Sequence, residues 1–148
     1  MPIRIKEDDV GELTSEGFAA CYRGLEVLTG AMHEWAGKST RSCADIWLPD
    51  GPIARIQRFG TCVEVLIFES IENFRAWQQV LGGASADERF RYVRLSPSIE
   101  NEESPQVCLQ HFEEFGRSAP VDDAMARRVE YVCRRLASTL RHALRQAA

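Results

Sequence analysis

The segment that follows Ser118 constrains the fold more than any other part of the chain. Pro120 is typical of a helix start, and the residues after it are apolar at three- and four-residue steps. At about 100° per residue, these apolar side chains fall within one narrow sector. They are Met125, Val129, Val132, Leu136, Leu140 and Ala143. We therefore expect a long amphipathic helix over residues 119–146, packed against the rest of the protein.

Two further segments show the same helical period. Between Ser15 and Trp35 the apolar residues recur at helical steps, with Thr14 or Ser15 as the cap and Gly37 as the end. A shorter helix is expected from Ser70, with its apolar stripe ended by two glycines. The sequence thus predicts main helices at residues 15–36, 70–82 and 119–146.

The remaining apolar runs have the composition of β-strands. They cover residues 3–6, 43–48, 53–59, 61–68, 89–95 and 106–112. Pro49, Asp50 and Gly51 separate two of these runs, which predicts a hairpin. Gly60 permits either a bulge or a second turn, and the sequence leaves both open. We expect one antiparallel sheet and therefore an α+β fold.

Composition narrows the class of protein. A chain of 148 residues with 45% hydrophobic residues is typical of a single domain, 1–148. Five scattered cysteines do not form a disulfide scaffold, and we expect reduced, structural thiols. The N-terminus lacks a signal peptide, and no apolar run is long enough for a membrane span, so a cytoplasmic protein is expected. The net charge of −4 argues against a nucleic-acid partner.

Two short motifs suggest chemistry but fail on context. Gly37-Lys38-Ser39-Thr40 resembles the end of a phosphate-binding loop. However, Met32 occupies the position at which that motif requires its first glycine, and a predicted helix precedes the motif where a strand is required. Cys108 and His111 lie three apart on a predicted strand, so they face opposite ways and cannot chelate one ion. The sequence predicts neither a metal site nor a cofactor.

The stretch from Val63 to Trp77 carries a resemblance to a known family. A predicted central strand runs directly into a helix that opens F-E-S-x-E-x-F-x-A-W. Over residues 3–95 the chain resembles the dimeric α+β-barrel proteins typified by the antibiotic biosynthesis monooxygenases. The resemblance implies a ferredoxin-like βαββαβ sheet with two packed helices, here extended by a C-terminal strand and the long amphipathic helix. It also implies a homodimer that binds a small organic molecule, as a cofactor-independent oxygenase or isomerase.

A second interpretation is a protein that binds other proteins without catalysis. If Gly60 is a turn, the order becomes helix, three strands, helix, two strands, helix. That order is similar to type III secretion chaperones, and an immunity protein that neutralises a toxin would have much the same features. Fold does not imply function, so the sequence leaves open whether the protein is an enzyme.

The enzymatic hypothesis names a specific pocket. Its walls would be Trp47, Trp77 and Phe68, and its polar groups would be His111 and Asp45. A histidine titrates near neutrality, and a dry site with one such group suits proton transfer. In the alternative, the aromatic residues belong to the core, Asp45 faces water and His111 is only hydrogen-bonded.

The interaction hypothesis names the last helix. Arg127, Arg134 and Arg141 lie opposite its apolar sector and are expected to face water. They form either an ordinary solvated face or a docking surface for an acidic partner protein.

Overall fold

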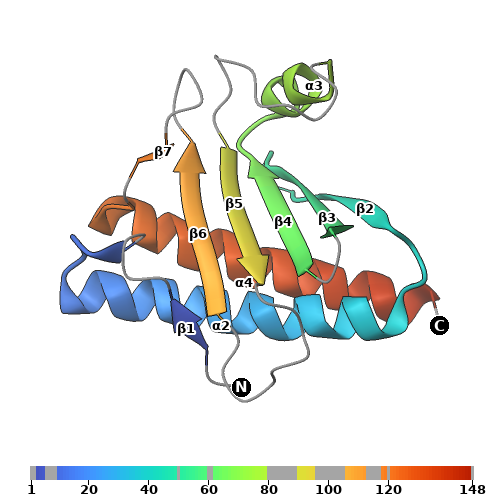
Figure 1. Cartoon of the computed structure of the whole chain (residues 1–148). Coiled ribbons are helices and arrows are strands. Elements are labelled where there is room, and N and C mark those ends of the chain that lie inside the picture. The colour runs from blue at the N-terminus through green and yellow to red at the C-terminus, as the bar shows by residue number, and fades with distance from the viewer. Residues whose placement is uncertain are drawn as a thin grey trace.

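A computed structural model describes residues 3–5, 10–49, 51–59, 62–79, 90–95, 106–112, 118–119 and 121–147 (Figure 1). Its elements follow the expected α+β pattern. In chain order they are β1 (Arg4–Ile5), α2 (Ser15–Lys38), β2 (Cys43–Trp47), β3 (Ile53–Phe59), β4 (Cys62–Phe68), α3 (Ile71–Gln79), β5 (Phe90–Leu95), β6 (Gln106–Phe112), β7 (Ser118–Ala119) and α4 (Asp123–Ala147). The three predicted helices and the strand runs are confirmed, with ends that differ by a few residues.

The strands form one sheet in the order β1-β6-β5-β4-β3-β2, with β7 beside β6. From β2 to β6, neighbours in sequence are neighbours in the sheet and pair antiparallel. This meander is not the ferredoxin-like arrangement that the resemblance implied, because β1 pairs only with β6 at one edge. The two-residue β1 also runs parallel to β6, which departs from the fully antiparallel sheet expected.

Gly60, at which the sequence left a bulge or a turn open, lies outside the described residues. β3 and β4 are separate strands that pair antiparallel up to Phe59 and Cys62. The chain therefore reverses direction between β3 and β4. Apart from the short β1 and β7, the element order is helix, three strands, helix, two strands, helix.

α2 and α4 lie side by side and cover one face of the sheet (Figure 1). The two helices run parallel, because the α4 residue that meets α2 advances along the chain from Asp123 beside Thr14 to Arg141 beside Glu34. Close packing needs glycine at Gly24, where an added Cβ would lie 2.7 Å from the Glu130 Cα atom. The main core fills the space between this helix pair and the sheet.

The ends of α2 show how local sequence and tertiary contacts combine. Thr14 caps the start as predicted, and its Oγ1 accepts a hydrogen bond from the Gly17 N–H at 3.1 Å. Gly37 does not end the helix, which continues to Lys38. Arg58 from β3 explains the extension, since its guanidinium donates to the Ala36 and Ser39 carbonyl oxygens at 2.9 and 2.6 Å. These bonds satisfy carbonyls that a helix end leaves without partners.

α4 begins later than residue 119, the predicted start. Ser118 and Ala119 instead pair with β6 as β7. Asp122 then caps the helix, because its Oδ1 accepts from the Met125 N–H at 2.8 Å. Residues 118–119, expected at the start of the helix, thus pair with the sheet instead.

The opposite face of the sheet carries a smaller apolar cluster. Its buried members are Ile53, Leu66, Phe68 and Phe74, with Ile71 packed against them. Phe74 and Ile71 belong to α3, so this short helix covers one end of the outer face. Among the described residues, no helix is long and apolar enough to cross a membrane.

Candidate functional site

Asp45 lies on β2 directly opposite Arg55 of β3. The guanidinium donates to both carboxylate oxygens, at 2.7 Å from Nε and 3.2 Å from Nη2. This hydrogen bond raises the pKa of Arg55 above its ordinary value. Arg55 also lies over the Phe74 ring, 5.4 Å from its centroid. Asp45 therefore belongs to a bidentate ion pair on the outer face of the sheet, an arrangement that occupies the oxygens a general base would use.

His111 is not brought near Asp45. It lies on β6, in register with Arg91 of β5 and Ala119 of β7. Three strands separate β6 from β2 in the sheet, and neighbouring strands are about 4.8 Å apart, so the two backbones lie about 19 Å from each other. The two residues named for proton transfer do not share a site.

Two of the predicted aromatic walls, Phe68 and Trp47, differ in their exposure. Phe68 is fully buried and packs edge-on against Phe74, with ring centroids 5.3 Å apart. Trp47 is 61% exposed at the edge of the sheet. Trp77 lies on α3, and its side chain is outside the described residues. Trp47 and Phe68 do share one cross-strand row, with Ile53 between them, so these two side chains lie on one face of the sheet.

The three arginines predicted on α4 are placed differently from one another. Arg127 is exposed, and no ion pair among the described residues involves it. Arg134 lies 3.6 Å from Glu130, one helical turn earlier, and stays half exposed. Arg141 reaches across to Glu34 of α2 at 3.4 Å, so it contributes to the contact between the helices. Arg127 and Arg134 are therefore exposed on α4, and of the three only Arg127 belongs to no ion pair among the described residues.

Tyr131 is the functional candidate that the sequence analysis missed. Its side chain is 44% exposed, and arginines occupy all four neighbouring positions three and four residues away on the helix. These are Arg127, Arg128, Arg134 and Arg135. The Arg128 guanidinium lies 5.7 Å from the ring centroid. We call these five residues the tyrosine–arginine patch; the sequence signal was the symmetric run R-R-V-E-Y-V-C-R-R.

Acidic side chains neutralise only part of this patch. Glu130 accepts from Arg23 of α2 at 2.7 Å and also meets Arg134, and the bond from Arg23 lowers the pKa of Glu130. Arg128 lies 3.5 Å from Glu69. Within the described part of the chain, Arg127 and Arg135 belong to no ion pair. The patch therefore keeps net positive charge although the whole chain is acidic.

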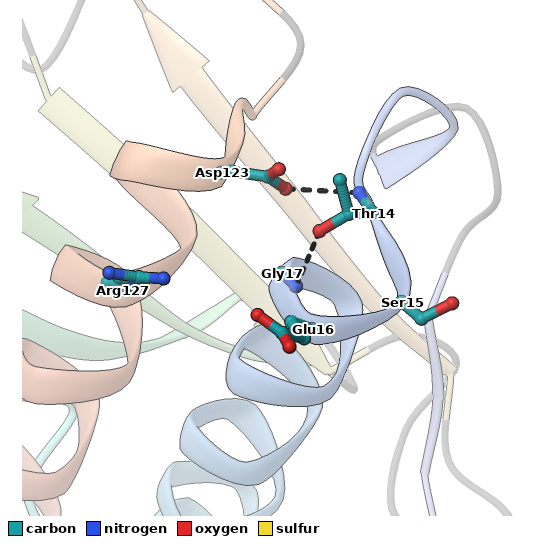
Figure 2. Close-up of a pocket in the computed structure, with 6 residues that line it drawn as sticks. All are labelled: Thr14, Ser15, Glu16, Gly17, Asp123 and Arg127. Atoms are coloured by element: carbon teal, nitrogen blue, oxygen red, sulfur yellow. Dashed lines mark hydrogen bonds between the residues drawn. The ribbon is translucent and has the colours of Figure 1, made fainter.

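A hollow of about 390 Å³ adjoins the patch where α2 and α4 begin (Figure 2). The residues that line it are Thr14, Ser15, Glu16, Gly17, Asp123 and Arg127. Asp123 accepts from the Thr14 N–H at 3.0 Å, and Gly17 leaves room for that carboxylate, which an added Cβ would strike. Its polar groups thus connect the two helix starts, and no aromatic wall lines the hollow.

Two of the cysteines belong to the buried core. Cys21 is buried between the helices and the sheet. Its burial, and to a smaller extent the negative charge of the nearby Glu130, raise the pKa of the Cys21 thiol to about 11. Cys133 is also buried, whereas Cys43 is exposed on β2. The described residues contain no cluster of three or more potential metal ligands.

Comparison with known proteins identifies no relative. No family model, no curated protein and no solved structure matches this chain.

Proposed function

We propose that this protein is a non-enzymatic binding domain that receives an acidic segment of another protein on the outer face of α4. The observation that carries the proposal is the tyrosine–arginine patch. Tyrosine and arginine are among the residues most enriched at the energetic centres of protein interfaces. A half-exposed tyrosine with arginines on every neighbouring helical position offers an apolar contact inside a positive field.

The organisation of the chain supports a binding role over catalysis. The order helix, three strands, helix, two strands, helix is the one that resembles type III secretion chaperones. The Asp45 carboxylate is ion-paired with Arg55, and His111 lies on a distant strand of the sheet. The dimeric α+β-barrel hypothesis, with an oxygenase or isomerase pocket, has less support because its two proposed catalytic residues, Asp45 and His111, lie on strands far apart in the sheet.

The charge of the patch determines the chemistry of the partner. Arg127 and Arg135 are the cations best placed to meet carboxylates, and Tyr131 lies between them along the helix. A segment with carboxylates on both sides of one apolar side chain would match both features. Because exposed charges act through screened fields, binding should weaken as salt is raised.

The test uses a fluorescently labelled glutamate-rich peptide with a central leucine and its lysine-rich counterpart. Fluorescence anisotropy should show binding of the acidic peptide only. The double variant Arg127→Glu/Arg135→Glu should weaken binding by roughly a hundredfold, since each reversal replaces attraction with repulsion. Tyr131→Ala should weaken it by roughly tenfold.

Arg41→Glu/Arg145→Glu is the matched control, because it also reverses two exposed arginines, one just after α2 and one in the last turn of α4, both away from the patch. It should leave the affinity within about threefold of wild type. Equal loss in the control and in Arg127→Glu/Arg135→Glu would mean that only net charge matters, and the proposal would fail. Equal binding of both peptides would also contradict it.

A further inference from the structure

We infer that β2 is a homotypic docking edge, at which a second copy of this chain adds its own β2 antiparallel to the first. This surface is distinct from the tyrosine–arginine patch, and the inference does not depend on the proposed function. Among the described strands, β2 has one neighbour, β3, and it ends the sheet on that side (Figure 1).

Hydrogen bonds in the β2–β3 hairpin identify which backbone groups point outward. The Arg58 N–H donates to the Ser42 oxygen and the Leu48 N–H donates to the Pro52 oxygen, both at 2.9 Å. In an antiparallel ladder, bonding alternates from one residue to the next. The backbone N–H and C=O groups of the even-numbered residues of β2 therefore point toward β3. The same groups of Cys43, Asp45 and Trp47 point away from β3.

These three residues are self-complementary. A second β2 that is centred on Asp45 would place Cys43 opposite Trp47 of the other copy and Asp45 opposite its own equivalent. All three pairs would then be hydrogen-bonded pairs, each exchanging two N–H···O bonds. One register thus satisfies every outward backbone group of both strands.

The side chains on this edge fit the same arrangement. Cys43, Asp45 and Trp47 share the outer face of the sheet, and Trp47 is the most exposed large apolar side chain among the described residues. In the paired strands, each Trp47 would cover the exposed Cys43 of the other copy. Like charges directly opposite are unfavourable, but Arg55 already neutralises each Asp45. The row across the two copies, Arg55–Asp45–Asp45–Arg55, is neutral.

Sedimentation equilibrium of the full chain tests the edge with two variants at one position. Asp45→Ala and Asp45→Pro both remove the carboxylate, but only proline also removes the outward N–H. Wild type and Asp45→Ala should be dimers at micromolar concentration. Asp45→Pro should remain folded by circular dichroism and dimerise at least tenfold more weakly. A monomeric wild type, or a proline variant that dimerises like the alanine variant, would overturn the inference.

The register is tested by a disulfide. Hydrogen-bonded pairs have Cα atoms about 5.5 Å apart, which lies within the range that a disulfide spans. In Trp47→Cys, mild oxidation should link the introduced thiol to native Cys43 of the other copy, as peptide mapping would show. The control Cys43→Ser/Trp47→Cys should form no covalent dimer. Links only between equivalent positions, or no link, would refute the antiparallel register.

Discussion

His33 shows how one side chain can set the response of the fold to acid. It lies on α2, and its Nε2 atom is buried without a hydrogen-bond partner among the described residues. Burial lowers the pKa of His33 below its ordinary value, since the charged form loses hydration. The folded protein therefore binds this proton less readily than the unfolded chain does.

The sign of the effect follows from that difference. Above the ordinary pKa of histidine, near 6.5, both states hold a neutral imidazole and the stability is fully present. As the pH falls toward 5, the unfolded chain takes up the proton first, so the free energy of unfolding decreases. We expect His33→Asn to show a flatter stability profile than wild type between pH 7 and 5 in urea titrations. An unchanged slope would contradict this, and His142→Asn, which alters an exposed histidine, is the control.

At the scale of elements, the pair of α2 and α4 depends on a close approach at one glycine. Gly24→Ala should favour an isolated helix, since alanine is the better helix former. In this protein the added Cβ would lie 2.7 Å from the Glu130 Cα atom and 3.4 Å from the Cys133 Cβ atom. We expect the overpacking to dominate and to reduce the free energy of unfolding by about 1–3 kcal/mol.

Gly37→Ala is the matched control for that prediction. Gly37 lies in the last turn of the same helix, and an added Cβ there meets nothing within 4 Å. Chemical denaturation should show a gain of about 0.5 kcal/mol for this variant. If both variants gain stability, the tight contact between the helices is not a constraint on the fold.

Most elements were predictable because their signals are local. The apolar period of α4 and the turn residues before β3 indicated structure without reference to the rest of the chain. Gly51 has a φ of 108°, the left-handed region that its place in the turn required. The wrong predictions concern element ends that are set by residues distant in the sequence. Arg58 bonds to the end of α2, which extends past Gly37, and Ser118 and Ala119 pair with β6 as a strand.

The candidate site was predictable only in part, for the same reason. Alternation placed Asp45 and Trp47 on one face of β2, but it gave no position for β6 relative to β2. The sheet order alone puts His111 far from Asp45. The arginines of α4 could be found from helical periodicity. Tyr131 could have been found with them, because its four arginine neighbours are visible in the sequence.

At the scale of the whole molecule, the core joins segments from opposite ends of the chain. α2 and α4 meet through residues about a hundred positions apart, such as Arg23 and Glu130 with a separation of 107. Neither helix can bury its apolar stripe without the other and the sheet. Contacts of this kind form only when the chain has folded as a unit, so we expect one cooperative transition.

Leu136→Ala tests that expectation. Leu136 is fully buried on α4, and truncating it should cost about 3 kcal/mol. Hydrogen exchange should then show the same loss of protection for the most protected amides of α2, α4 and β4. Ser138→Ala, an exposed change on the same helix, should leave all three unaffected. Loss confined to α4 would show that the helix opens independently.

The parallel course of α2 and α4 has an electrical consequence. Each helix carries roughly half a positive charge at its start and half a negative charge at its end, and two parallel helices add these charges where antiparallel ones would cancel them. The first turns hold Glu16 and Asp123, and the last turns hold Lys38 and Arg145. The side chains thus oppose the backbone dipoles at both ends. Salt should weaken both the repulsion between the like ends of the two helices and the attraction of those ends to the oppositely charged side chains. The stability of the helix pair should therefore change little with ionic strength.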